Sequence, residues 1–315
     1  MAFTMHSHSG QFCPGHGKDM LEVIVQHAIG VGLKTMGLTE HIPRISPEDL
    51  YPEEHELPEC SSLTGLDSPL HAAYLAEAQR LRAAYPSLHI LIGIEGEWYR
   101  PEYAEHMRAL LADPAIDYFI GSVHHARGGI PIDYDVATYA TAVQAAGHGS
   151  ERGLYATYYD DQLEMLQALR PRIVGHFDLI RLLSSNPARD VRAEWPEVWE
   201  RMLRNLRFVV ELGAWLECNT SALRKGLSEP YPTRQVAEEY LKMGGRFTFS
   251  DDSHGTAQVT TNYARGLDYL ESLGVTEVWT FKRTPPTVAG EKGTLEDVSV
   301  TLAEFRASLT PRTQE

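Results

Sequence analysis

The sequence predicts an α/β fold, a (β/α) barrel, with its functional site at the C-terminal ends of the strands. Short apolar or β-branched segments alternate repeatedly with longer segments of helical spacing over 315 residues. This alternation is typical of parallel strands joined by right-handed helical crossovers. Histidines and carboxylates follow the apolar segments, and in a barrel all strand ends meet in one mouth. An open sheet would spread the same side chains along a wide edge.

Each element is expected from the spacing of apolar residues and from Pro or Gly at its ends. Residues 89–94 are almost continuously apolar, as in a strand covered on both faces. Pro101 suits the first turn of one helix, and Gly244 follows the end of another. The expected strands are residues 2–5, 36–39, 89–94, 116–123, 172–175, 214–220, 246–250 and 276–281. The expected helices are residues 18–34, 70–85, 101–111, 149–169, 196–212, 233–243, 262–273 and 295–309.

One polar segment interrupts this alternation. Residues 43–69 are rich in Pro and in carboxylates, and a loop of this length is usually functional or disordered. The chain contains no internal repeat, low-complexity tract or convincing linker. We therefore expect one domain over residues 1–315, with 43–69 as an acidic insert and 283–315 as a C-terminal extension.

Composition and charge restrict the possible partners. The net charge of −15 disfavours broad, non-specific binding to nucleic acid. Three cysteines (Cys13, Cys60 and Cys218) imply no disulfide framework and favour a reducing compartment. The N-terminus lacks a basic and apolar targeting pattern, and no stretch approaches the length of a membrane span. We expect a cytoplasmic protein that binds neither nucleic acid nor membrane, and the sequence does not predict its oligomeric state.

Nine side chains at the expected strand ends have the chemistry of metal ligands. His6 and His8 are two residues apart at the end of a strand, so both imidazoles project from the same face. Glu95 ends an apolar strand, where a lone carboxylate is costly to bury unless it is paired or metal-bound. His254 follows Asp252 with the same two-residue spacing. The nine candidates are His6, His8, His16, His41, Glu95, His124, His176, Asp252 and His254.

Strand parity separates these candidates from their neighbours. Adjacent residues point to opposite faces, so only one of His124 and His125 reaches the centre. We expect His124 as a ligand and His125 as a contact either of the substrate or of a metal ligand. Glu97 shares the parity of Glu95 but is expected to lie further into the following loop. Asp178, two residues after His176, is expected to orient a ligand imidazole.

Nine candidate ligands exceed the four of a structural zinc site and suit two or three divalent ions. Ions about 3.5–4 Å apart hold both the entering and the departing oxygen of an in-line displacement, which suits a phosphate ester. Such a site accepts zinc, iron or manganese, and the sequence does not choose among them. Glu95, Asp252 and His254 are the expected catalytic residues. The expected phosphate-binding residues are Asn219, Arg224, Lys225 and Arg181.

These motifs resemble the polymerase-and-histidinol-phosphatase (PHP) superfamily. The motifs that carry the resemblance are His6-x-His8, His16, Glu40-His41, Gly93-Ile94-Glu95, Ser122-Val123-His124, Gly175-His176-Phe177-Asp178 and Asp252-Ser253-His254. The stretches Asn219-Thr220, Arg224-Lys225-Gly226 and Glu229-Pro230-Tyr231-Pro232 resemble the histidinol-phosphate phosphatase branch. The resemblance extends from residue 5 to about residue 281 and covers most of the chain.

The resemblance implies a distorted (β/α)7 barrel with three metal ions that hydrolyses L-histidinol phosphate to L-histidinol and phosphate in histidine biosynthesis. It also implies three ligand sets: His6, His8, Glu95 and Asp252; His16, His41 and His254; and Glu95, His124 and His176. A hydroxide shared by the metals would attack phosphorus in line, and Arg224 would offset charge on the phosphate oxygens. Other members carry Asp at the position of Glu40, so we expect no ligand role for Glu40.

The expected partner is therefore this small phosphate ester. Its amine and imidazole are cationic near neutral pH, and Glu53, Glu54 and Glu56 of the acidic insert are candidates to face them.

Three other functions fit parts of the pattern. An amidohydrolase also begins with H-x-H, but it usually needs a bridging Lys that no expected strand end offers here. A phosphodiesterase or nuclease of the same superfamily is disfavoured by the acidic charge and the absence of a basic stripe. A non-catalytic metal-storage protein would need a closed metal shell, whereas the loop with Asn219, Arg224 and Lys225 suggests room for an anion.

Overall fold

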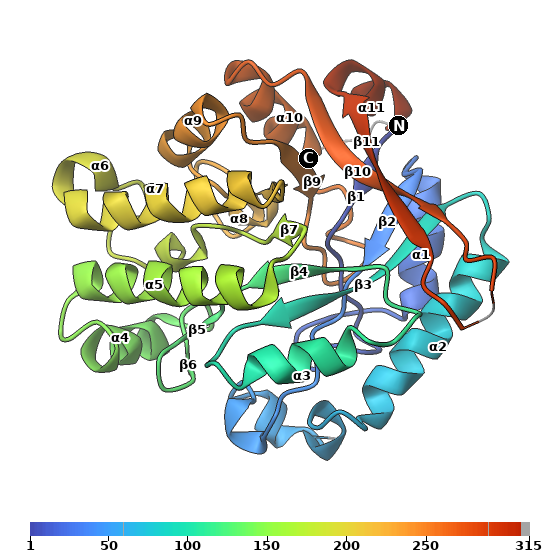
Figure 1. Cartoon of the computed structure of the whole chain (residues 1–315), viewed down its shortest axis with the longest axis horizontal. Coiled ribbons are helices and arrows are strands. Elements are labelled where there is room, and N and C mark those ends of the chain that lie inside the picture. The colour runs from blue at the N-terminus through green and yellow to red at the C-terminus, as the bar shows by residue number, and fades with distance from the viewer. Residues whose placement is uncertain (59, 289, 310–315) are drawn as a thin grey trace.

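The computed structural model describes residues 1–58, 60–288 and 290–309, and its central feature is a sheet of seven parallel strands. In spatial order the strands are β1 (Phe3–Thr4), β2 (Thr35–Leu38), β3 (His89–Glu97), β4 (Tyr118–Ser122), β7 (Ile173–Val174), β8 (Trp215–Asn219) and β9 (Phe247–Ser250). The two edges meet, because Met5 N–H donates to Phe249 O at 3.2 Å and Ser7 forms a parallel bridge with Ser253. The sheet is therefore a nearly closed barrel, which confirms the predicted fold class (Figure 1).

Helices surround the barrel between successive strands (Figure 1). Seven expected helices form, with ends that differ from the expected ones by at most four residues: α1 (Leu21–Gly30), α2 (Pro69–Ala84), α3 (Tyr103–Leu110), α5 (Glu151–Leu169), α7 (Pro196–Glu211), α9 (Arg234–Lys242) and α10 (Tyr263–Ser272). Three further helices were not predicted: α4 (Val136–Ala145), α6 (Val191–Glu194) and α8 (Ser221–Arg224). The β-branched composition of α4 gives a weak helical signal, and its start depends on Asp135, whose side chain accepts a hydrogen bond from Thr138 N–H.

The C-terminal segment differs from the sequence prediction. The strand expected at 276–281 is β10 (Glu277–Thr284), which pairs antiparallel with β11 (Thr294–Thr301) and does not join the barrel. The prediction of a helix over 295–309 is wrong for the first half of that range, because within it only α11 (Leu302–Ser308) is helical. Pairing with β10 stabilises the preceding segment as a strand, a long-range contact that local spacing does not reveal. Residues 310–315 of the expected extension lie outside the described residues.

The β10–β11 hairpin covers the end of the barrel opposite the strand C-termini (Figure 1). The ring of Phe281 stacks on Trp215, at the start of β8, with 4.6 Å between centroids, and lies 5.6 Å from Tyr118 at the start of β4. Arg283 Nε donates to Asp117 Oδ1 at 2.6 Å on the same side. The hairpin therefore does not cover the C-terminal ends of the strands, where the polar side chains lie.

The acidic insert folds against the barrel as three short 3₁₀ turns, η1 (Pro47–Asp49), η2 (Glu54–Glu56) and η3 (Cys60–Leu63). Its two ends are tied together, since Arg44 N–H donates to Leu63 O and Gly65 N–H donates to Arg44 O, each at 2.8 Å. A small hairpin of β5 (His125–Ala126) and β6 (Ile130–Pro131) follows β4. Within the described ranges, no helix combines the length and the apolar character needed to cross a membrane.

Gly37 in β2 tests how tightly the barrel interior is packed. A Cβ atom at this position would lie 1.9 Å from Tyr118 Oη and 2.8 Å from Met5 O. We expect Gly37→Ala to lower the free energy of unfolding by about 1–3 kcal/mol, because overpacking displaces both neighbours. Gly30→Ala, at an exposed helix end with no neighbour within 4 Å, is the matched control and should be neutral or slightly stabilising. Urea unfolding followed by circular dichroism compares them, and equal stability of the two variants would contradict tight packing at Gly37.

Candidate metal centre

The C-terminal strand ends bring the nine candidate ligands into one cluster, with Glu95 at its centre. The two Glu95 oxygens lie 3.1–3.3 Å from ring nitrogens of five histidines: His6, His8, His41, His124 and His176. Asp252 Oδ1 lies 3.5 Å from His8 Nε2 and 3.7 Å from nitrogens of His6 and His254. His16 lies at the edge of the cluster, with its ring centroid 6.1 Å from that of His41. The role of these side chains as metal ligands stays a prediction.

Within this cluster the donor atoms form three groups compact enough to hold an ion. In each group, one donor atom from every member lies within 4.8 Å of the others. The groups are His6, His8 and Glu95; Glu95, His124 and His176; and His8, Cys13, His41 and His254. The first two match sets implied by the family resemblance, apart from Asp252. The third contains Cys13 and His8 in place of the expected His16.

Several buried nitrogen atoms of the cluster fit a bound cation. Among the described residues, Nε2 of His6, both ring nitrogens of His8 and Nδ1 of His41 make no hydrogen bond, although carboxylate oxygens lie 3.1–3.8 Å from each of them. Buried polar atoms are normally satisfied, because an unpaired one costs about 1–3 kcal/mol. Imidazole nitrogens gathered around carboxylates are the donor set that zinc, iron or manganese prefers. The residues present therefore suit divalent metal ions.

Glu217 in β8 orients two of these histidines and was missed in the sequence analysis. Its Oε1 lies 2.8 Å from Nδ1 of His6, and its Oε2 accepts the backbone N–H of His176 at 2.9 Å. A carboxylate on the second ring nitrogen fixes the tautomer and the direction of a ligand imidazole. One feature of the sequence could have indicated this role. Glu217 lies two residues before Asn219 in the same strand, so both side chains point to the inside of the barrel.

Asp178, which we expected in the orienting role, does something else. Its Oδ2 accepts the backbone N–H of Thr233 at 2.8 Å and lies 3.3 Å from Arg181 Nε. The strand β7 ends at Val174, so the alternation assumed beyond His176 does not hold, and a 3₁₀ turn from Leu179 to Arg181 directs the chain away. The prediction for Asp178 was therefore wrong.

Glu97 is also placed differently from the prediction, because β3 continues to this residue. Glu97 pairs in register with Ser122 and is fully buried. Its Oε1 lies 3.2 Å from Nδ1 of His41 and 3.3 Å from Nδ1 of His124. Arg44, itself buried, approaches Oε2 at 3.5 Å. Glu97 thus connects two candidate ligands to a buried arginine instead of lying in a loop.

The pKa values of the cluster show how strongly its charges are coupled. Burial alone would lower the pKa of His6, but Glu95, Glu217 and Asp252 together raise it well above its ordinary value. Burial would raise the pKa of Glu95 and of Asp252, yet the neighbouring histidines hold both well below their usual range. The carboxylates are therefore ionised and require positive charge beside them, which protons on imidazoles or bound cations supply.

A cavity of about 300 Å³ opens at this mouth and contains one of the expected phosphate-binding residues. Its lining includes His124, His176, Asp252 and His254 together with Lys225. Lys225 follows α8 at the rim and is exposed. Among the described residues, Lys225 is the only lysine or arginine that lines this cavity.

The other residues expected to bind the substrate have other partners in this structure. The two Nη atoms of Arg224 donate to the carbonyl oxygens of Asp251 and Asp252, each at 2.9 Å. Arg181 Nη2 donates to the carbonyl oxygens of residues 229 and 230 at 2.9 and 2.8 Å. Asn219 is buried, and its Nδ2 lies 3.0 Å from Glu217 Oε2. His125 is buried and stacks on Tyr99 with 4.2 Å between ring centroids.

Arg224 supports the backbone of a candidate ligand. Asp252 has φ of 49°, in the left-handed region that a residue other than Gly occupies only when its surroundings hold it there. The two hydrogen bonds from Arg224 hold the carbonyl groups on either side of the Asp252 Cα atom. The turn directs the Asp252 carboxylate toward His6 and His8.

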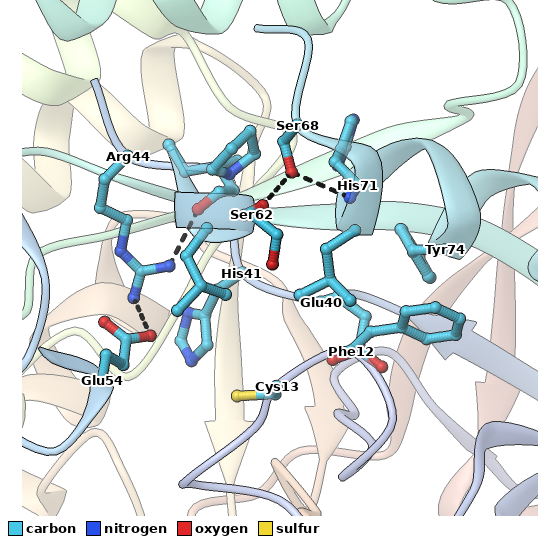
Figure 2. A pocket seen from close by; sticks show the side chains of 14 residues that line it. Phe12, Cys13, Glu40, His41, Arg44, Glu54, Ser62, Ser68, His71 and Tyr74 are labelled. Carbon is cyan, nitrogen blue, oxygen red and sulfur yellow. Dashed lines mark hydrogen bonds and ion pairs between the residues drawn. The ribbon is translucent and has the colours of Figure 1, made fainter. Parts of the chain in front are cut away.

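The three acidic-insert residues differ in their placement. Glu53 lines the mouth cavity, and its Oε1 lies 3.2 Å from His16 Nδ1. Glu54 is buried and forms an ion pair with Arg44 at 3.2 Å, as Figure 2 shows. Glu56 is exposed and does not belong to the cavity lining. Of the three, Glu53 is therefore the one placed to meet a ligand in the cavity.

Comparisons with known proteins agree on one family. A model of the PHP domain matches residues 4–221. The "Probable histidinol-phosphatase" of Schizosaccharomyces pombe is 40% identical over 286 residues, covering 90% of this chain and 91% of that protein. The histidinol-phosphatase of Saccharomyces cerevisiae is 35% identical, covering 84% and 87% of the two chains. The crystal structure of histidinol phosphate phosphatase from Lactococcus lactis, in complex with zinc, L-histidinol and phosphate, shares the fold with a TM-score of 0.67 and 20% identity over 93% of this chain and 98% of that one.

Glu217→Gln tests the orienting role of this carboxylate. The neutral amide keeps the shape of the side chain but removes the charge beside His6 Nδ1, so we expect zinc affinity to fall about 10–100-fold. Glu211→Gln, an exposed change at the end of α7, is the control and should leave the affinity unchanged. Competition with a chromophoric chelator measures both affinities. Equal affinity of the two variants would show that Glu217 does not support a metal ligand.

Proposed function

Because the chain belongs to the PHP domain family, we propose that it is a metal-dependent phosphomonoesterase that hydrolyses L-histidinol phosphate to L-histidinol and phosphate. The observation that carries this proposal is the mouth of the barrel, where Glu95 is shared by two compact donor groups beside a cavity that contains a lysine. The names of the two yeast relatives support histidinol phosphate as the substrate.

Two or three divalent ions are proposed to bind at this mouth, with zinc, iron and manganese as the candidates. Glu95 would be shared between an ion held by His6, His8 and Asp252 and an ion held by His124 and His176. When bound, such ions make water a nucleophile near neutral pH and offset the charge on phosphate oxygens.

The chain's own residues bind and position the substrate. Lys225 attracts the phosphate group into the cavity as a point charge, despite the net charge of −15 of the whole chain. Arg224 holds the Asp252 turn through two backbone carbonyl groups, so we propose that it acts through position instead of touching phosphate. Glu217 and Glu97 keep the imidazoles of His6, His41 and His124 in fixed directions.

Phosphate release from L-histidinol phosphate, measured together with metal content, tests this function. We expect a metal-loaded enzyme to release phosphate, to lose activity with a chelator and to regain it with added metal. Asp252→Asn should reduce kcat/KM by more than the roughly 10–100-fold that is typical for loss of an outer-shell partner. The control is Asp268→Asn, an exposed carboxylate on α10 that pairs with Arg306.

A metal-loaded chain that releases no phosphate, or one that is unaffected by Asp252→Asn, would reject the proposal. Faster hydrolysis of an amide, or release of nucleotides from single-stranded DNA, would point instead to the alternative hydrolases considered from the sequence.

Glu53 offers a test of how the cationic part of the substrate is recognised. Its Oε2 makes no hydrogen bond with any residue that the structure describes, although the side chain lines the cavity. We expect Glu53→Gln to raise KM for histidinol phosphate by roughly two- to five-fold, as loss of a partly exposed ion pair would. KM for a phosphomonoester of an uncharged alcohol should not change. Glu56→Gln is the matched control from the same turn region, and an equal effect of both variants would contradict a specific contact by Glu53.

A further inference from the structure

Cys13 occupies a defined position on the loop between β1 and α1. Its N–H donates to Ser9 O at 2.9 Å, and its carbonyl accepts the N–H of Gly17 at 2.8 Å. Ser9 is in turn held by Glu40, whose Oε1 accepts the Ser9 hydroxyl at 2.6 Å and the Ser9 N–H at 2.9 Å. The backbone of this loop therefore fixes where the thiol lies.

The thiol lies beside three imidazoles. One donor atom each from Cys13, His8, His41 and His254 falls within a 4.8 Å group. The His8 ring stacks on His41 and on His254, with centroid distances of 4.5 and 4.3 Å. Cys13 and His41 both line a second, smaller cavity beside the acidic insert, and Figure 2 shows the Cys13 sulfur on the side of this cavity where the His41 ring lies. Cys13 is a free and buried cysteine, so its sulfur is available as a ligand.

His16, which the resemblance places with His41 and His254, is engaged differently. Its Nδ1 lies 3.2 Å from Glu53 Oε1, and its Nε2 lies 3.5 Å from Glu54 Oε1. It belongs to none of the compact donor groups found among the described residues. Both ring nitrogens of His16 therefore face carboxylates of the acidic insert.

We propose that Cys13 binds, as a thiolate, the metal ion held by His41 and His254. Binding replaces the thiol proton with a metal–sulfur bond and releases that proton to solvent. A soft thiolate beside imidazoles favours zinc or ferrous iron over manganese at this position. This inference rests on the metal dependence in the proposed function and does not depend on the identity of the substrate.

X-ray absorption spectroscopy of the intact zinc-loaded protein tests the assignment without any substitution. We expect a sulfur neighbour of zinc at about 2.3 Å in addition to nitrogen and oxygen neighbours. A fully loaded protein whose zinc has no sulfur neighbour would overturn the assignment. The same sample is assayed for phosphate release, so that a chain that hydrolyses histidinol phosphate without a zinc–sulfur bond rejects only the role of Cys13. A chain that binds no metal rejects the proposed function as well.

Cobalt substitution identifies which cysteine supplies the sulfur. The cobalt-loaded wild-type protein should show a near-ultraviolet sulfur-to-cobalt charge-transfer band, and Cys13→Ala should lose that band together with one bound ion per chain. Cys218→Ala is the matched control, since Cys218 is a free, fully buried thiol in β8 and belongs to none of the donor groups. Persistence of the band in Cys13→Ala, or its loss in Cys218→Ala, would contradict the assignment.

Discussion

Several carboxylates are buried at the barrel mouth, and the arrangement of the site depends on how their negative charge is compensated. Glu95, Glu97, Glu217 and Asp252 are all nearly inaccessible to solvent. An ionised carboxylate in such surroundings is very costly unless positive charge or hydrogen bonds compensate it. The histidines and Arg44 provide part of this compensation, which explains why the pKa values of Glu95 and Glu97 are held well below their usual range despite burial.

The need for positive charge beside these carboxylates explains why the barrel mouth suits metal ions. Bound divalent ions would supply the rest of this positive charge, and the imidazoles proposed to hold them are already directed by Glu217 and Glu97. The apolar interior and the β10–β11 hairpin support the opposite end of the barrel, where Phe281 packs on Trp215. The polar and apolar ends thus have separate roles, as is general for barrels whose sites lie at the strand C-termini.

The acidic insert is joined to the charged groups of the barrel mouth through Arg44. Arg44 links the buried Glu54 of the insert to Glu97 of the barrel, with Glu54 Oε1 at 3.2 Å and Glu97 Oε2 at 3.5 Å. Glu53, one residue before Glu54, lines the mouth cavity together with several candidate metal ligands. Lys225 and Glu53 therefore give one cavity two opposite charges, an arrangement that suits a ligand with an anionic phosphate and a cationic amine.

The sequence by itself determined the barrel class, most of its helices and the chemical type of the site. These depend on local spacing: His6 and His8 share a face because strand side chains alternate, and Glu95 is conspicuous because it ends an apolar run. Tertiary structure alone decided the roles of Glu217 and Glu97, the pairing of β10 with β11 and the position of Cys13 beside His41 and His254. Each of these depends on contacts between segments far apart in the chain, and strand parity does not predict which distant side chain completes a pair. The prediction for Asp178 failed for the same reason, since β7 ends at Val174 and no alternation continues beyond it.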